Sequence, residues 1–203
     1  MKSLPTLLTL FRIFMGPAIA ALVLWAASEQ YNDRILAGLI YALAVVLFVI
    51  AAVTDWVDGW LARKLDAVTP MGAALDHTAD KVLIACVLVA LAYAALPLQL
   101  TAAAVIILGR DIAIGGLREG LSNQGRTLPV AQLGKWKAAA EMAGVGAFLA
   151  YECAALLQLS ASVIVGLFYA ACILIWIAAA LALLSAALYA RKALNPADRT
   201  QSS

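Results

Sequence analysis

Long apolar runs separated by short polar stretches dominate the pattern of this chain. Six such runs are present, at residues 16–28, 35–54, 74–95, 98–117, 134–153 and 160–190. A helix needs roughly 20 apolar residues to cross a bilayer, and most of these runs are close to that length or exceed it. The pattern therefore predicts an all-α integral membrane protein with six transmembrane helices.

The first 15 residues differ from the runs that follow because they mix charge with large apolar side chains. Lys2 and Arg12 lie among leucines and phenylalanines, and Gly16 and Pro17 follow directly. This pattern predicts an amphipathic helix that lies at the membrane interface before the first span. A cleaved signal peptide is the alternative, but no small-residue cleavage site precedes a polar sequence, so an uncleaved start is expected.

Composition agrees with a membrane protein and excludes several classes of site. Of the 203 residues, 65% are hydrophobic and only 13% are charged, which is unlike a soluble globular domain. We therefore expect one membrane-embedded domain over residues 1–203, with no nucleic-acid partner. His77 is the one histidine in the sequence, which argues against a metal site built from several histidines and against a Ser-His-Asp triad. The three cysteines lie in apolar runs without metal-ligand spacing.

The distribution of basic residues predicts an orientation. Every lysine and arginine except Arg34 lies on or near the side of the membrane that carries both termini. Cytoplasmic loops are enriched in lysine and arginine, so both termini are expected in the cytoplasm, with the protein in a bacterial inner membrane.

Four carboxylates stand among apolar neighbours at the end of the second run and the start of the third. Asp55 and Asp58 are three residues apart, and Asp76 and Asp80 are four apart, so each pair shares one face of a helix. Two helices joined by a turn at residues 66–70 would aim all four at one point. Their mutual repulsion requires cations, and hard oxygen ligands suit Mg²⁺ or Mn²⁺. The alternative, four acids on a solvated helix face, conflicts with the apolar neighbours.

Nearby residues suit a phosphate-containing ligand. Gly59 and Gly72 permit close approach of a ligand, and Arg63 could bind a phosphate through two N–H groups. Two divalent ions would clamp a diphosphate, and a carboxylate could accept a proton from an incoming hydroxyl. These residues predict a metal-dependent phosphoryl-type transfer at the membrane surface.

The spacing of eight residues resembles the signature of the CDP-alcohol phosphotransferase family. The matching positions are Asp55, Asp58, Gly59, Ala62, Arg63, Gly72, Asp76 and Asp80. The resemblance implies transfer of a phosphatidyl or related group from a CDP-linked donor to an alcohol, with release of CMP. It further implies that the first three aspartates bind metal and that Asp80 is both a metal ligand and the general base.

The same resemblance implies a pocket for the CDP part of the donor and a homodimeric assembly. The residues implied to line the CDP pocket are Gly59, Ala62, Arg63 and Gly72, with Asp66 and Thr69 as additional candidates.

Three further stretches resemble one branch of that family, the bacterial phosphatidylglycerophosphate synthases. They are the opening residues 4–12, residues 109–119 and residues 133–142. In this branch the donor is CDP-diacylglycerol and the acceptor is sn-glycerol 3-phosphate. The resemblance implies that Arg110, Arg118 and Lys135 hold the acceptor phosphate.

Four residues depart from the pattern of the branch. Thr6 stands in place of asparagine, His77 in place of proline, and Asp111 and Glu141 in place of glutamate and glutamine. None of them removes an expected metal ligand, but they weaken the choice of glycerol 3-phosphate as the acceptor.

The same chemistry with another acceptor therefore stays open: phosphatidylglycerol, serine or inositol phosphate. A divalent-cation transporter is the alternative from another class, although no second acidic cluster lies deeper in the membrane.

Overall fold

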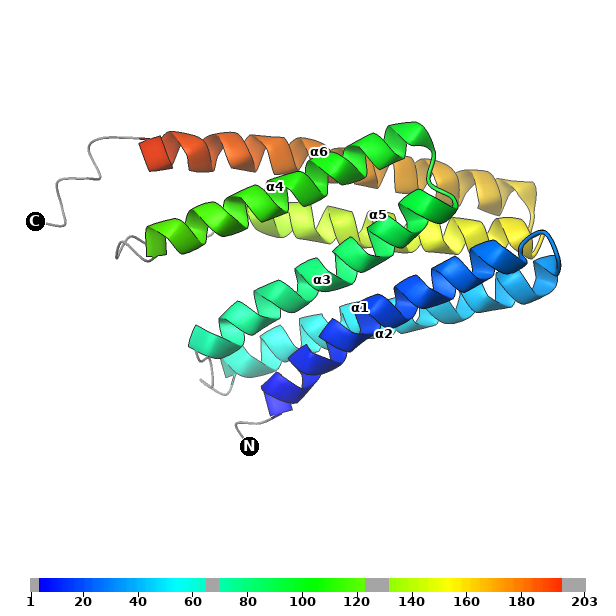
Figure 1. Cartoon of the computed structure of the whole chain (residues 1–203), viewed down its shortest axis with the longest axis horizontal. Helices are drawn as coiled ribbons and strands as arrows, with labels where there is room; N and C mark the ends of the chain where they lie inside the picture. Colours follow the sequence, from blue (N-terminus) through cyan, green and yellow to red (C-terminus); the bar gives the residue numbers. More distant parts are fainter. Residues whose placement is uncertain (1–3, 65–69, 123–131, 195–203) are drawn as a thin grey trace, which may run out of the picture.

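The chain folds as a bundle of long helices. The computed structural model describes the backbone of residues 4–64, 70–122 and 132–194 and the side chains of residues 10–54, 78–117, 119–120 and 133–191. These residues form six helices: α1 (Leu4–Glu29), α2 (Arg34–Lys64), α3 (Pro70–Ala94), α4 (Leu98–Ser122), α5 (Gln132–Leu156) and α6 (Ala161–Leu194). Successive helices run in opposite directions, so α1 begins and α6 ends at the same end of the bundle (Figure 1). We call this end the site end.

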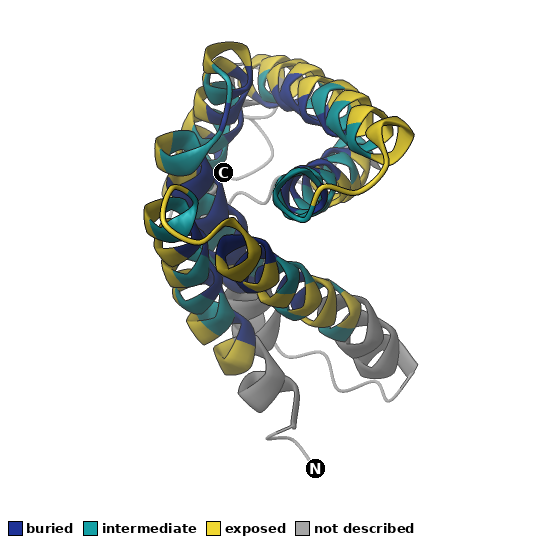
Figure 2. Ribbon diagram, turned by 90° about the vertical axis from the view of Figure 1, so that its right-hand side faces the viewer, coloured by how far each residue is buried: buried dark blue, intermediate teal, exposed yellow. Residues whose placement is uncertain are grey.

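The helices have the length and surface of membrane-spanning elements. Within the described residues, five segments are long and apolar enough to cross a bilayer: Leu10–Glu29, Arg34–Thr54, Leu98–Leu117, Leu133–Leu156 and Ala161–Arg191. The predicted span at residues 74–95 falls partly outside the described side chains. Large apolar residues such as Phe14, Val105 and Ile112 are exposed on outer faces, and buried residues face inward (Figure 2). The prediction of an all-α integral membrane protein is confirmed.

The first helix differs from the expected interfacial helix followed by a span. α1 continues from Leu4 to Glu29 without interruption, and Pro17 lies inside it. Gly16 is buried, and a Cβ atom placed on it would lie 2.9 Å from the Cα of Leu83 and 3.2 Å from the carbonyl oxygen of Val82. Gly16 is therefore the point where α1 meets the backbone of α3. Proline is tolerated there because neighbouring helices stabilise a membrane helix from outside.

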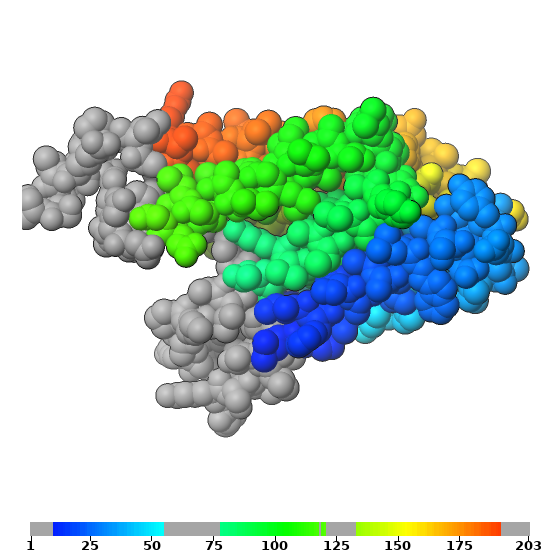
Figure 3. Space-filling view, in the orientation of Figure 1, coloured from blue at the N-terminus to red at the C-terminus, as the bar shows by residue number. Residues whose placement is uncertain are grey.

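Two groups of three helices make up the bundle. α1 packs against both α2 and α3, α6 packs against both α4 and α5, and α2 packs against α5 to join the groups. Gly144 of α5 lies against the backbone of Ile175 in α6, and Gly146 lies against the ring of Phe48 in α2. Small residues let membrane helices approach closely, which increases van der Waals contact. α3 meets α4 over a small area, and α1, α3 and α4 lie side by side on one face (Figure 3).

Polar contacts close the opposite end of the bundle. The carboxylate of Asp33 accepts a hydrogen bond of 2.9 Å from the backbone N–H of Leu36, which caps the start of α2. Arg34 donates a hydrogen bond of 2.7 Å to the carbonyl oxygen of Ala155 near the end of α5. This contact ties the two joining helices together at the end remote from the site.

A substitution at Gly16 tests the contact between α1 and α3. The variant Gly16→Ala is expected to lower the free energy of unfolding by about 1–3 kcal/mol, because the added methyl group overlaps backbone atoms that have no freedom to rotate away. Thermal unfolding of the detergent-purified chain measures the effect. The matched control is Gly166→Ala in α6, where a Cβ would meet no atom within 4 Å and stability should hold or rise. Equal stability of Gly16→Ala and the unaltered chain would refute the contact.

Candidate active site

Asp80 is the member of the predicted carboxylate cluster whose side chain the structure describes. It lies on α3, and its Oδ1 atom is 2.5 Å from the Nη1 atom of Arg12 on α1. The Arg12 side chain is fully buried, whereas 34% of the Asp80 side chain is exposed. The arginine therefore approaches the carboxylate from the protein interior, and the accessible side of the carboxylate faces away from the core.

The other signature positions lie on helices, but their side chains fall outside the described residues. The last part of α2 carries Asp55, Asp58, Gly59, Ala62 and Arg63, and the first part of α3 carries Gly72 and Asp76. Asp66 and Thr69 fall between these helices and lie outside the described backbone. The helical backbone places Asp76 one turn before Asp80, as the spacing predicts. Among the described side chains no three metal-ligating groups lie together, and the proposed metal set remains a prediction because it extends beyond them.

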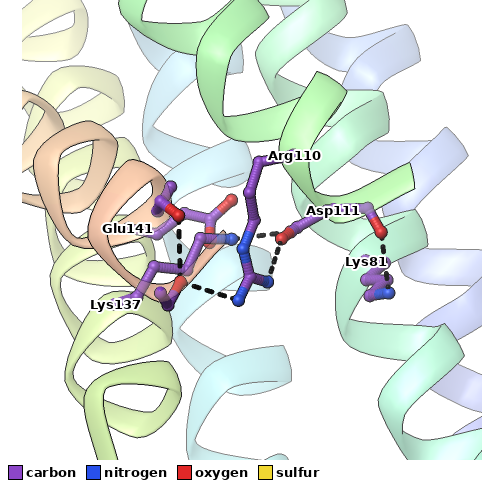
Figure 4. Close-up of polar contacts among 7 residues, drawn as sticks. Lys81, Arg110, Asp111, Lys137 and Glu141 are labelled. Carbon is purple, nitrogen blue, oxygen red and sulfur yellow. Dashed lines mark hydrogen bonds and ion pairs between the residues drawn. The ribbon is translucent and has the colours of Figure 1, made fainter. Parts of the chain in front are cut away.

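A second polar cluster joins α4, α5 and α6 (Figure 4). Asp111 of α4 receives two cations: Arg110 Nη1 at 2.9 Å from Oδ1 and Lys137 Nζ at 2.6 Å from Oδ2. Lys137 also pairs with Glu141 one turn later in α5, with Nζ 2.5 Å from Oε2. We call these four residues the ion network; its two cations and two carboxylates balance in charge.

Residues of α6 complete the surroundings of Arg110. Its Nη2 donates a hydrogen bond of 2.7 Å to the hydroxyl of Ser185, which is buried and itself donates to the carbonyl of Ala182. The guanidinium carbon lies 5.9 Å from the ring centre of Tyr189, within range of a cation–π contact. The Nε atom of Arg110 is buried without a hydrogen-bond partner among the described residues. An unpaired buried donor is costly, so an acceptor at this atom would stabilise the site.

The structure describes the side chains of two of the three residues predicted to hold the acceptor phosphate, and these two differ in burial. Arg110 belongs to the ion network, Lys135 is exposed, and the side chain of Arg118 lies outside the described residues. Lys137 occupies the buried position instead, with 5% of its side chain exposed. The two lysines differ because a step of two residues turns the chain by roughly 200° around a helix. The sequence alone placed both lysines at one membrane surface, and only packing distinguishes them.

Lys81 connects the two clusters. It follows Asp80 on α3, and its Nζ donates a hydrogen bond of 3.2 Å to the backbone carbonyl of Asp111 on α4 (Figure 4). A Cβ atom on Gly115, one turn further along α4, would lie 3.2 Å from the same Nζ. Because a small residue stands there, the ammonium group reaches the α4 backbone. Consecutive residues of α3 thus contact α1 at Asp80 and α4 at Lys81.

An apolar groove opens between α2 and α5. Its volume is about 430 Å³. Its lining residues are apolar throughout: Phe48, Val49, Ala52, Val53, Ala139, Met142, Ala143 and Gly146. Along α2 the groove comes directly before Asp55, and along α5 it lies among residues that flank Glu141. A hydrocarbon chain could therefore lie beside a polar reaction centre.

The sequence does not single out Arg12 as a site residue. Lys137 belongs with Arg110, Arg118 and Lys135 to a basic set that could face an anionic acceptor, but it is not among the three residues that the resemblance assigns to the acceptor phosphate. The sequence does contain one indication that Arg12 is buried: it lies one helical turn before Gly16. A small residue on the same helix face as a charged residue indicates that this face packs against another helix. No comparable local signal separates Lys137 from Lys135.

Comparisons with known proteins point to one family. A family model described as CDP-alcohol phosphatidyltransferase matches residues 2–184. A Pseudomonas fluorescens protein named CDP-diacylglycerol–glycerol-3-phosphate 3-phosphatidyltransferase is 38% identical over 73% of this chain and 72% of its own length. A Bacillus subtilis protein of the same name is 35% identical over 75% of this chain and 79% of its own length.

A plant relative carries a different name. A protein of Oryza sativa subsp. japonica named cardiolipin synthase (CMP-forming) is 34% identical over 94% of this chain. The matched part spans 57% of the rice protein, so the rice protein is considerably longer than the region of likeness.

The two lysines of α5 provide a test of the ion network. The variant Lys137→Met leaves the buried Glu141 without its cation and Asp111 with Arg110 alone, so a loss of about 3 kcal/mol in the free energy of unfolding is expected. Lys135→Met removes an exposed lysine and should change stability by less than about 0.5 kcal/mol. Thermal unfolding of both purified variants measures the difference. Equal stability of the two would show that the network is absent in solution.

Proposed function

The chain belongs to the CDP-alcohol phosphatidyltransferase family, and from this premise we propose that it transfers the phosphatidyl group of CDP-diacylglycerol to sn-glycerol 3-phosphate. The products are phosphatidylglycerophosphate and CMP. The observation that carries this choice of substrates is the likeness to the two bacterial enzymes, which extends over more than 70% of each chain. The Asp signature and the basic residues of α4 and α5 support it.

Asp80 is the proposed general base. Its carboxylate accepts the proton of the glycerol hydroxyl, the resulting oxygen attacks the phosphorus that bears the diacylglycerol, and the bond from that phosphorus to CMP breaks. The partial exposure of Asp80 at the site end supports access of a water-soluble acceptor. Arg110 supports binding of the acceptor phosphate, because its buried Nε atom needs an acceptor. Arg118 and Lys135 are proposed as further contacts of that phosphate.

Two divalent ions, Mg²⁺ or Mn²⁺, are the proposed cofactors. The fit is one of ligand chemistry: Asp55, Asp58, Asp76 and Asp80 offer hard carboxylate oxygens, and the helical backbone spaces the last two by one turn. When bound, the ions would neutralise the diphosphate of the donor. Gly59, Ala62, Arg63 and Gly72 are proposed to line the CDP pocket, with Asp66 and Thr69 beside them.

The groove between α2 and α5 is a proposed place for one acyl chain of the donor. Its lining is apolar, it opens on a face of the bundle that lipid would cover, and it lies next to the signature along α2. A hydrocarbon chain there would leave the diphosphate at the site end. The interior of the membrane would supply the donor, and the aqueous phase would supply the acceptor.

We further propose that the site end faces the cytoplasm of a bacterial inner membrane and that the protein is a homodimer. The excess of basic residues near the termini supports this orientation. The start of α1 and the end of α6 lie at one end of the bundle, which supports placing both termini on one side.

Phosphatidylglycerol is the second candidate acceptor, with cardiolipin as the product. The likeness to the rice cardiolipin synthase over 94% of this chain favours it. It would keep the donor, the metal ions and the role of Asp80 and would change only the acceptor. Phosphatidylglycerol is itself a lipid, so this acceptor would reach the site through the membrane rather than from water.

A panel of acceptors tests the proposed reaction. Purified protein in mixed micelles with CDP-diacylglycerol and Mg²⁺ should release CMP with glycerol 3-phosphate, and not with phosphatidylglycerol, serine or inositol phosphate. Asp80→Asn should lower the rate per folded molecule by about 10²–10⁴-fold. The folded fraction is measured by thermal unfolding, because this variant also removes the charge partner of the buried Arg12. Release with phosphatidylglycerol alone would favour the second candidate, and no release with any acceptor would defeat both.

Filling the apolar groove tests the place of the acyl chain. Ala143→Phe puts a large side chain into the groove and should raise KM for a donor with long acyl chains about tenfold, because the chain loses apolar contact. A donor with six-carbon acyl chains should show no such rise. Ala170→Phe, at an exposed position of α6 outside the groove, is the matched control. A rise in KM that is the same for both donors would place the acyl chain elsewhere.

A further inference from the structure

Arg12 is a buried charge in a bundle that lipid surrounds. Its side chain has no exposed surface, and its guanidinium meets a carboxylate 68 residues further along the chain. Placing a charge at membrane depth is costly, so such residues generally serve a function and face a partner inside the bundle. Arg12 thus differs from the exposed basic residues that only set orientation. Its partner is Asp80, the proposed general base.

The packing around Arg12 fixes its position. One turn later on α1, Gly16 lies against the backbone of Val82 and Leu83 on α3. Contacts one turn apart on parallel helices therefore join Arg12 to Asp80 and Gly16 to Leu83. The close backbone contact prevents α1 from shifting along α3. The guanidinium consequently reaches Asp80 from a rigid helix rather than from a mobile loop.

We propose that Arg12 is a positioning residue that orients the carboxylate of Asp80 toward the acceptor hydroxyl; this inference rests on the proposed function. The ion pair engages Oδ1 from the buried side, and this contact restrains rotation of the carboxylate about its last torsion. The accessible side of Asp80 is then held toward the site. Arg12 is too deeply buried to touch a substrate, so it acts through Asp80.

The neighbouring residue of α3 strengthens this assignment. Lys81 is directed to the carbonyl of Asp111 on α4, so α3 is held from two sides at consecutive residues. A rotation of α3 that moved Asp80 away from Arg12 would also displace Lys81 from α4. The orientation of Asp80 therefore depends on both helix groups, with Arg12 as the direct contact. Displacement of a catalytic group by about 1 Å can lower a rate by about 10²-fold.

Substitution of Arg12 distinguishes positioning from a merely structural role. Arg12→Gln removes the charge and should lower kcat about 10²-fold, while KM for CDP-diacylglycerol and for glycerol 3-phosphate changes little. Arg12→Lys keeps the charge without the planar fork and should recover part of this loss. The measurements are kcat, both KM values and the thermal unfolding midpoint of each purified full-length variant. Arg34→Gln, at the opposite end of the bundle, is the matched control and should keep the unaltered kcat.

Each outcome decides the inference. Unaltered kcat in Arg12→Gln would overturn it, and so would a loss of kcat that only follows the fraction of folded protein. If Arg12→Gln does not fold, Arg12→Lys decides: a kcat reduced about tenfold with unchanged KM values supports positioning, and unaltered kcat overturns it. Failure of the proposed function is separate, because the unaltered chain would then release no CMP with any acceptor.

Discussion

A charged side chain inside a bilayer-spanning bundle requires an opposite charge or a hydrogen-bond partner, because neither lipid nor an apolar core provides one. The buried cations of this protein meet the requirement across helix boundaries. Arg12 of α1 pairs with Asp80 of α3, and Lys137 of α5 pairs with Asp111 of α4. These pairs link side chains of different helices near the site end, directly between α1 and α3 and across the interior between α4 and α5. Apolar contacts alone would determine the rotation and axial position of each helix poorly. A leucine side chain gains little by leaving lipid for the bundle interior, because both surroundings are apolar.

Small residues make these pairs geometrically possible. Gly16 allows the backbones of α1 and α3 to touch one turn from the Arg12–Asp80 pair, and Gly115 leaves room for Lys81 to reach the α4 backbone. Between α5 and α6, Gly144 provides the same kind of close contact. Polar pairing and close packing therefore occur in the same regions. Tight packing keeps charged groups at bonding distance, and the ion pairs hold the helices in register.

α3 is the element through which the two helix groups meet around the proposed chemistry. Its contact area with α4 is small, and Lys81 supplies a polar link across it. The preceding residue, Asp80, faces α1 and is partly exposed. A helix held on both sides by polar contacts can present a carboxylate in a fixed orientation. On the other side of the bundle, the groove between α2 and α5 offers an apolar surface close to the signature.

The sequence by itself determined the all-α class, the approximate limits of the helices and the family. The lengths of the apolar runs and the spacing of the signature residues are local properties, so they can be determined from the sequence without a structure. The sequence did not show that the expected interfacial helix and the first span form one helix, α1, in which Gly16 packs against the backbone of α3. Only the tertiary structure decided that Arg12 is paired with Asp80 and that Lys137, rather than Lys135, is buried. The physical reason is that a side chain's partner depends on the rotation of each helix about its axis. That rotation is set by contacts between residues far apart in the chain.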